Sequence, residues 1–144
     1  MSVLADQRTI LIVEDNAADA GLVADALDGA PSSPVLLTAT SGHAALELLA
    51  ASDPELLPDV VLLDLNLPGY SGLETLADLK ARNRLRRIPV IVLTTSKSQH
   101  EIDSCYDLGA AAVLNKPLRL RDYRAMIAAL ERFWLGHVRL PARG

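Results

Sequence analysis

Several apolar runs of this sequence end in polar residues whose side chains can take part in chemistry. The runs are followed in turn by an acidic pair, by a single acid, by two hydroxyls and by a lysine with a proline; these residues are Glu14, Asp15, Asp64, Thr94, Thr95, Lys116 and Pro117. Carboxylates bind divalent metal ions, and a carboxylate can accept a phosphoryl group as an acyl phosphate. These residue types point to phosphoryl chemistry, provided that the fold brings them together.

Taken singly, each of these residues has a structural explanation. Asp15 could cap a helix, Asp64 could begin a turn, and Thr94 could bond to a loop. Lys116 could be a solvated charge before Pro117, which ends a strand. Only their combination at one edge of one sheet favours a binding or catalytic site over these explanations.

The apolar runs lack polar alternation, which is typical of parallel strands covered by helices on both faces. We expect five strands, over Thr9 to Val13, Pro34 to Ala39, Asp59 to Leu63, Pro89 to Leu93 and Ala111 to Leu114. Helices should begin after Asp15-Asn16, after Ser41, after Ser71 and near Ser98, and the last should span about Leu120 to Leu135. Right-handed crossovers then produce an α/β fold with a doubly wound five-stranded parallel sheet, whose crevice lies at the carboxyl ends of the strands.

Three carboxylates meeting at that edge, from Glu14, Asp15 and Asp64, would repel one another unless a cation lies between them. The histidines are too scattered for a transition-metal cluster, and hard oxygen ligands favour Mg²⁺. Asp15, Asp64 and a backbone carbonyl from the following turn would hold the metal, with Glu14 acting directly or through water. Asp64 would then be the nucleophile, while Lys116 and the Thr94 hydroxyl bind the other phosphoryl oxygens.

The motifs also resemble, in kind and in order, the receiver domains of response regulators. The matching segments are ILIVEDN, VVLLDLNLPGYSGLE, VIVLTTS and GAAAVLNKP, and the resemblance runs from about Thr9 to Tyr123. It implies a flavodoxin-like receiver fold with strand order 2-1-3-4-5 and with Asp64 as phosphoacceptor. It further implies that the backbone carbonyl of Asn66 ligates Mg²⁺, that Thr94, beside Thr95, is the switch hydroxyl, and that a cis peptide bond precedes Pro117.

One position departs from the receiver pattern. Receivers usually carry a tyrosine or phenylalanine three residues before the lysine, and this sequence has Val113 there. In the family, that ring moves into the space that the threonine hydroxyl leaves when it turns toward the phosphate. Val113 cannot make this movement, so the usual coupling of phosphorylation to the distal face is in question. Tyr106 lies in the fourth helix pattern, and the sequence does not assign it the missing role.

The composition favours one soluble domain spanning residues 1–144, with a core over about 9–135 and no output domain. The 144 residues are half apolar, no run approaches the ~20 residues of a membrane span, and the start lacks a signal-peptide pattern, so we expect a cytoplasmic protein that has no membrane partner. Cys105 is the only cysteine. The net charge of -4 disfavours nucleic-acid binding, and we interpret the basic cluster Arg82, Arg84, Arg86 and Arg87 as a solvated loop.

The C-terminal segment ERFWLGHVRLP resembles, less specifically, the tail of small receivers that work with phytochrome-type histidine kinases. The last expected helix has two apolar stripes, of which the second carries Met126 and Phe133. Two stripes suit either a helix end folded onto its own core or a symmetric homodimer. The dimer candidates are Tyr123, Met126, Phe133 and Trp134.

We therefore expect a single-domain response regulator that receives a phosphoryl group from the phosphohistidine of a sensor histidine kinase and then changes its binding to an unidentified downstream protein. It would catalyse only its own modification. An aspartyl-nucleophile phosphatase is a rival, but such enzymes typically place a second aspartate where this chain has Asn66. A receiver-like adaptor that is never phosphorylated would lack an acidic, acceptor or lysine position, and a nucleotide-binding module would need a glycine motif that is absent here.

Overall fold

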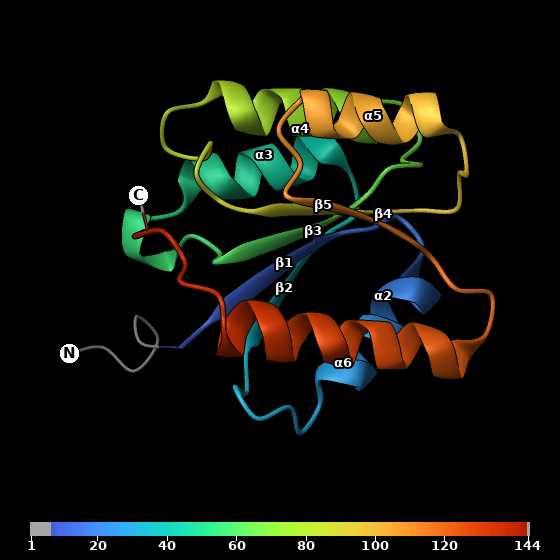
Figure 1. The fold of residues 1–144 in the computed structure, drawn as a ribbon. Coiled ribbons are helices and arrows are strands. Elements are labelled where there is room, and N and C mark those ends of the chain that lie inside the picture. The colour runs from blue at the N-terminus through green and yellow to red at the C-terminus, as the bar shows by residue number, and fades with distance from the viewer. Residues whose placement is uncertain (1–6, 144) are drawn as a thin grey trace.

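A computed structural model of the protein describes residues 7–143 and shows strands and helices alternating along the chain (Figure 1). The strands are β1 (Thr9–Val13), β2 (Val35–Ala39), β3 (Val60–Asp64), β4 (Val90–Thr94) and β5 (Ala112–Asn115). The helices are α2 (Ala17–Leu27), α3 (Gly42–Ala51), the 3-10 helix η1 (Pro54–Leu56), α4 (Gly72–Ala81), α5 (Gln99–Asp107) and α6 (Leu120–Gly136). The predicted α/β alternation is confirmed.

The five strands form one parallel sheet in the order β2-β1-β3-β4-β5, as expected. From β1 the chain crosses to β2 on one side and later returns to β3 on the other side of β1. The strand order therefore reverses between β1 and β3, where doubly wound sheets open a crevice at the carboxyl ends of their strands. Glu14 and Asp15 follow β1, and Asp64 ends β3, so the acidic residues lie at this reversal.

The later strands begin one residue after the predicted positions. Pro34 and Pro89 precede β2 and β4 because a proline has no backbone N–H to donate to a neighbouring strand. At their other ends, β3, β4 and β5 extend to include Asp64, Thr94 and Asn115. The functional residues are consequently fixed by strand pairing, with Asp64 beside Leu93 and Thr94 beside Asn115.

Local hydrogen bonds explain where four of the helices begin. The side chains of Asn16, Ser41, Ser71 and Ser98 each accept a hydrogen bond from a backbone N–H in the first turn of α2, α3, α4 and α5. Such caps satisfy N–H groups that have no partner within the helix. The predicted helix starts are confirmed, and α6 begins at the predicted Leu120 without a side-chain cap.

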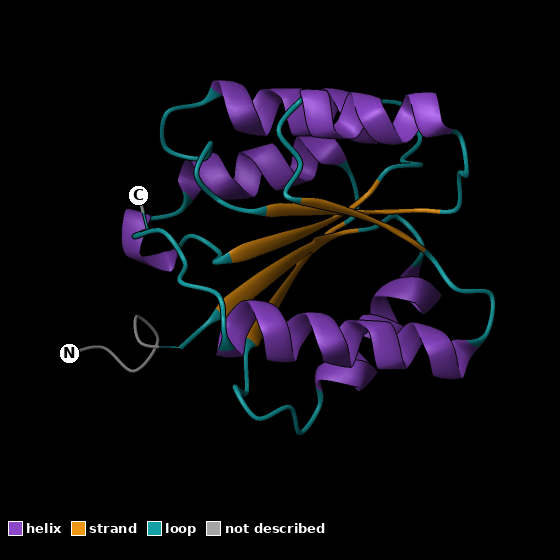
Figure 2. Cartoon of the chain, viewed as in Figure 1, coloured by secondary structure: helices purple, strands orange, loops and turns teal. Residues whose placement is uncertain are grey.

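Helices cover both faces of the sheet, with α3, α4 and α5 on one face and α2 and α6 on the other (Figure 2). Alternate residues of each strand face opposite layers. Leu11, Leu63 and Val92 belong to the core under α3 to α5, whereas Ile12, Leu62 and Leu93 belong to the core under α2 and α6. No helix within residues 7–143 is both long and apolar enough to span a membrane.

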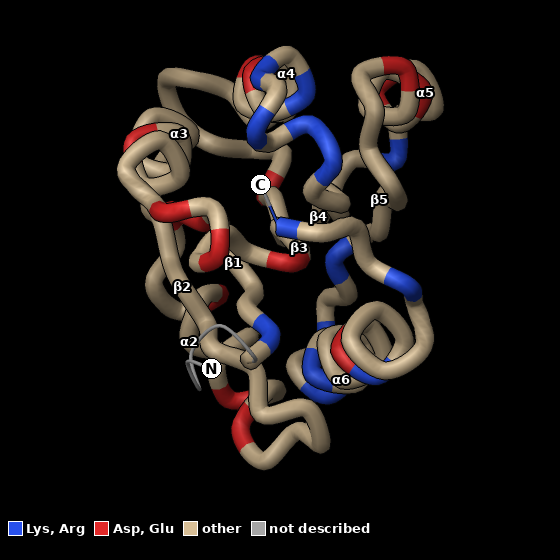
Figure 3. The backbone as a smooth tube through the Cα atoms, turned by 90° about the vertical axis from the view of Figure 1, so that its left-hand side faces the viewer, with Lys and Arg blue, Asp and Glu red and all other residues tan. Residues whose placement is uncertain are grey.

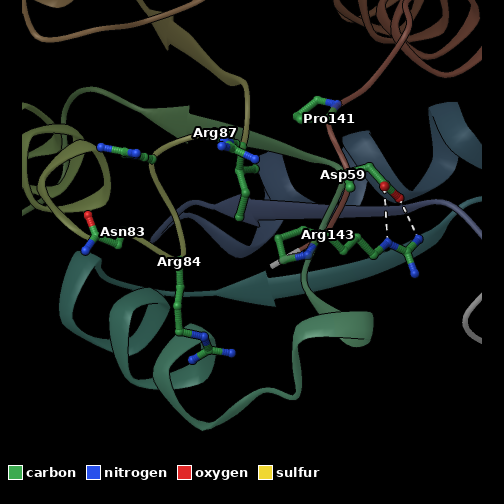
Figure 4. Close-up of a pocket in the computed structure, with 10 residues that line it drawn as sticks. Asp59, Asn83, Arg84, Arg87, Pro141 and Arg143 are labelled. Atoms are coloured by element: carbon green, nitrogen blue, oxygen red, sulfur yellow. Dashed lines mark hydrogen bonds and ion pairs between the residues drawn. The ribbon is translucent and has the colours of Figure 1, made fainter.

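The C-terminal tail returns to the amino ends of the strands, the edge opposite the acidic residues. The Arg143 guanidinium donates to the Asp59 carboxylate at 3.2 Å and 2.8 Å and to the backbone oxygens of Glu55 and Gln7 (Figure 4). The Asp59 side chain is only 1% exposed, and it also accepts a hydrogen bond from the Thr9 amide at 2.8 Å. The tail is thus part of the folded domain.

The basic cluster lies beside this tail. Figure 3 looks onto this edge and shows basic residues between α4 and β4, near the C-terminal end of the chain. Arg82, Arg84, Arg86 and Arg87 are all exposed, which agrees with a solvated loop, and Arg84 donates to the backbone oxygens of Ala50 and Ser52. A pocket of about 150 Å³ separates Asn83 and Arg87 from Arg143 (Figure 4).

Candidate functional site

Three carboxylates converge at the strand reversal. Glu14, Asp15 and Asp64 each offer an oxygen, and these oxygens lie within 4.8 Å of one another. Glu14 and Asp64 are buried, at 4% and 5% exposure, while Asp15 is exposed. A buried face and an open face suit a metal ion that is held by protein oxygens and still binds water or a ligand. The donor set fits a divalent metal ion.

Lys116 enters this cluster from the end of β5. Its ammonium lies 2.9 Å from Glu14 Oε2, 3.3 Å from Asp64 Oδ2 and 3.6 Å from Asp19 Oδ2, and its side chain is 10% exposed. Burial alone would lower the pKa of Lys116, but the hydrogen bond to Glu14 and the charge of Asp64 outweigh it and raise the pKa. Lys116 therefore remains a cation beside the Asp64 carboxylate.

The surroundings of Glu14 disfavour the ionised form of its carboxyl group. Burial, opposed by Lys116 and reinforced by the neighbouring Asp64 carboxyl, raises the pKa of Glu14 from 4.5 to about 7. Its Oε1 accepts the Asn16 amide at 3.1 Å and its Oε2 accepts Lys116. Both oxygens are thus occupied, which suits Glu14 for contacting a metal ion through water.

The hydroxyls at the end of β4 form the other wall of the site. Thr94 is fully buried, and its Oγ1 accepts a hydrogen bond from the Ser96 amide at 3.0 Å, so its hydroxyl hydrogen is free to be donated elsewhere. Thr95 is exposed, and its Oγ1 accepts from Asn66 Nδ2 at 3.3 Å. This hydrogen bond joins the loop after β3 to the loop after β4 at the carboxyl edge of the sheet.

The turn after Asp64 packs against the start of α4 at a glycine. The Asn66 amide donates to Asp64 Oδ1 at 3.0 Å, which orients the Asp64 side chain from the turn side. A Cβ on Gly72 would lie 2.6 Å from the backbone of Leu65 and 2.8 Å from the Asp64 carbonyl oxygen. Only glycine permits this close approach of α4 to the end of β3.

Two residues near the site were not anticipated from the sequence. Asp19 contacts Lys116 from the first turn of α2, a position that follows from its spacing of three residues after the Asn16 cap. The Tyr123 hydroxyl is buried and has no hydrogen-bond partner within the described residues. Burial is the main reason that the pKa of Tyr123 is raised to about 12. Both residues line a pocket of about 190 Å³ beside Lys116.

Two sequence expectations are wrong. The bond before Pro117 is not cis, because no cis peptide bond occurs within residues 7–143; the trans form is the intrinsically favoured one, and it still brings Lys116 to Asp64. Tyr123 is not available for a dimer contact, because it is 3% exposed and lies on the face of α6 that packs against the sheet. Met126 and Trp134 are partly buried against the same core, while Phe133 is 56% exposed.

Fold and site together define a doubly wound α/β domain with an acidic triad, a hydroxyl and a lysine at the carboxyl edge of its sheet. The sequence matches the response regulator receiver domain family over residues 10–128. The chain therefore belongs to the response regulator receiver family.

Several members of this family are similar to nearly the whole chain. The chain is 39% identical to the response regulator Rcp1 of Synechocystis sp. over 140 residues, which span 94% of each chain. It also resembles the crystal structure of the phosphorylated cyanobacterial phytochrome response regulator RcpA, with 36% identity, a TM-score of 0.87 and coverage of 94% of this chain and 99% of that one. The Mn²⁺-bound form of Rcp1 gives 38% identity, a TM-score of 0.86 and the same coverage.

Proposed function

We propose that the protein is a single-domain phosphorylation switch in which Asp64 accepts a phosphoryl group from the phosphohistidine of a sensor histidine kinase. The observation that carries this proposal is the convergence of Glu14, Asp15 and Lys116 on the buried Asp64 carboxylate. One Asp64 oxygen attacks phosphorus, the bond from phosphorus to the histidine nitrogen breaks, and an acyl phosphate forms. The protein catalyses only its own phosphorylation and dephosphorylation.

Each residue of the site has a distinct role in this step. The Lys116 ammonium exchanges its contact with Glu14 for one with the incoming phosphoryl oxygens, which carry more charge. The Thr94 hydroxyl donates to another of these oxygens, because its hydrogen is not used in the present contacts. Mg²⁺, held by Asp15, Asp64 and the Asn66 carbonyl with Glu14 beside it, would supply charge neutralisation between acceptor and donor.

The relatives support a particular kind of kinase. Rcp1 is named a response regulator, and RcpA is described as a phytochrome response regulator. Both match 94% of this chain. We therefore expect a phytochrome-type histidine kinase as donor and a downstream protein, still to be identified, as the recipient of the signal.

A homodimer is part of this proposal. We assign the dimer contact to the face of α5, β5 and α6. Helix α6 carries Phe133, 56% exposed, whose ring meets Trp134 edge-on with centroids 6.1 Å apart. Aromatic residues are enriched at association surfaces relative to the rest of a protein surface. Sedimentation should give a dimer that Phe133→Ser weakens. A monomer with and without a phosphoryl mimic would contradict the dimer.

The proposal is tested by incubating the protein with acetyl phosphate and measuring its intact mass. A phosphoryl increment should appear with MgCl₂, disappear with EDTA, and be absent from Asp64→Asn under both conditions. A protein that gains no mass with MgCl₂ would overturn the proposed switch. An external phosphate ester that is turned over many times per protein molecule would support the phosphatase alternative instead.

A further inference from the structure

Helix α5 packs against β5 and α4 but buries few of its side chains. Of its residues Gln99–Asp107, Cys105 is the one that is buried. A helix with so little buried apolar surface has a low local stability and is easily displaced. Polar contacts at its two ends therefore contribute to where it lies.

Asn115 holds the loop that leads into α5. Its Nδ2 donates to the Ser96 carbonyl oxygen at 2.6 Å and to the Thr94 carbonyl oxygen at 3.4 Å. Because both partners are acceptors, the amide nitrogen must be the atom that faces them. Asn115 also directly precedes Lys116, whose amide donates to the Thr94 carbonyl at 2.8 Å. One exposed side chain thus connects the two phosphate-binding strand ends.

Ser96 carries this attachment into the helix itself. Its Oγ donates to Glu101 Oε2 at 2.8 Å and accepts from the Ser98 amide at 3.2 Å. Ser98 is the cap of α5, and Glu101 lies in the first turn. A movement of Ser96 is therefore transmitted to the N-terminal end of α5.

Tyr106 holds the other end of α5 to β5. Its hydroxyl accepts a hydrogen bond from the Val113 amide at 3.2 Å. Strand β5 is the edge of the sheet, and this amide has no neighbouring strand to donate to. Val113 is also the position at which receivers usually carry an aromatic ring. In this chain, the aromatic residue Tyr106 thus contacts the backbone of Val113 from helix α5.

We propose that Asn115 and Tyr106 together take over the coupling that an aromatic residue on β5 would otherwise provide. This inference rests on the proposed phosphorylation of Asp64. When the Thr94 hydroxyl turns toward the phosphoryl group, the Ser96 carbonyl leaves Asn115 and the N-terminal end of α5 moves. Tyr106 keeps the C-terminal end beside Val113, so that α5 pivots.

The strength of these bonds suits a reversible switch. Both side chains are exposed, and each bond contributes about 1 kcal/mol net because water competes for it. Removing one such bond changes the ratio of two arrangements by about fivefold. Asn115 is a positioning residue in this scheme, because it contacts the loop and not the phosphoryl group.

The test follows the α5 amide signals of the full chain by ¹⁵N NMR, with acetyl phosphate and MgCl₂ as the probe. The extent of phosphorylation is measured in the same samples by intact mass. In the wild-type protein, the α5 signals should move on phosphorylation. In unphosphorylated Asn115→Ala, the chemical shifts of these signals should already lie partway between those of the unphosphorylated and the phosphorylated wild-type protein. The displaced arrangement of α5 should be about fivefold more populated than in the unphosphorylated wild-type protein. Asn115→Gln, which keeps the donor, should restore part of the wild-type position.

Tyr106→Phe keeps the ring and removes the acceptor of the Val113 amide. Its phosphorylation should still move the signals of residues 95–98, but the coordinated movement of the whole helix should be lost. The matched controls are Asn83→Ala, an exposed asparagine at the opposite edge, and Tyr70→Phe, whose hydroxyl donates to the Glu74 carbonyl at 3.2 Å. Both controls should reproduce the wild-type response.

The outcomes separate this inference from the proposed function. If the wild-type protein is phosphorylated but Asn115→Ala and Tyr106→Phe respond as the controls do, the coupling through these residues is wrong. A lowered melting temperature in Asn115→Ala without movement of the α5 signals toward those of the phosphorylated wild-type protein would indicate a purely structural role and would also overturn it. A wild-type protein that gains no phosphoryl group contradicts the proposed function instead.

Discussion

The Lys116 ammonium lies 2.9 Å from Glu14 and 3.3 Å from Asp64, so that one buried cation balances two buried carboxylates. These are the two least exposed acids of the triad. Lys116 consequently has a structural role in the metal-free protein, in addition to the role in phosphoryl transfer that we propose.

Lys116→Met should therefore destabilise the metal-free protein by about 3 kcal/mol, because it leaves buried carboxylates without a partner. Mg²⁺ should restore more stability to this variant than to the wild-type protein, because the metal replaces the missing positive charge. Urea unfolding in EDTA and in MgCl₂ measures both effects, with the exposed Lys97→Met as control. Equal losses for the two lysines would refute the structural role.

The raised pKa of Glu14 predicts how stability depends on pH. Its pKa rises from 4.5 to about 7 on folding, so the folded state binds this proton more tightly than the unfolded state does. The stabilisation of the folded state by the Glu14 proton is complete below pH 4.5 and is lost as the pH rises through about 7. In EDTA, the wild-type protein should lose more unfolding free energy between about pH 5 and about pH 8 than Glu14→Gln does. The same slope in both proteins would contradict this assignment.

Two glycines at helix starts should both reject alanine but should differ in how alanine affects phosphorylation. A Cβ on Gly72 would meet the backbone of Leu65 and Asp64, whereas a Cβ on Gly42 would meet the buried side chain of Thr75 and the ring of Tyr70. Gly72→Ala should displace the turn after Asp64, destabilise the protein by about 3 kcal/mol and slow phosphorylation, whereas folded Gly42→Ala should be slowed less because it does not touch the Asp64 backbone. Denaturation measures the stability and intact mass the phosphorylation rate, and a greater slowing in Gly42→Ala would contradict the prediction.

The ion pair of Arg143 with Asp59 should affect stability without affecting phosphorylation, because it lies at the opposite edge of the sheet (Figure 4). Arg143→Ala should lower the free energy of unfolding by about 2 kcal/mol, since it removes one partner of a buried carboxylate. Exposed Arg82→Ala should have little effect. A loss of phosphorylation in folded Arg143→Ala would show that the tail acts on the site.

The fold was predictable because local and global signals agree. Unbroken apolar runs specify buried parallel strands, and Asn16, Ser41, Ser71 and Ser98 specify the helix starts that the structure shows. The convergence of Glu14, Asp15, Asp64 and Lys116 follows from the topology, because all of them lie at carboxyl ends of strands.

The remaining features depend on side-chain packing, which sequence spacing does not reveal. Tyr123 appeared suited to an interface, but the rotation of α6 turns it into the core. The bond between Tyr106 and Val113 joins a helix and a strand through a single hydroxyl, and no pattern in the sequence marks it. The isomer of the bond before Pro117 was expected from the family resemblance alone, and the structure differs.

The central claim is that Asp64 carries the phosphoryl group, and borohydride reduction of the phosphorylated protein tests it most directly. Acyl phosphates of aspartate are reduced to homoserine, which peptide mass spectrometry locates in the sequence. Homoserine should appear at position 64, only after incubation with acetyl phosphate and MgCl₂. Homoserine at position 15, 2-amino-5-hydroxypentanoic acid at position 14, or the absence of homoserine from a protein that has gained a phosphoryl group would contradict the assignment of Asp64.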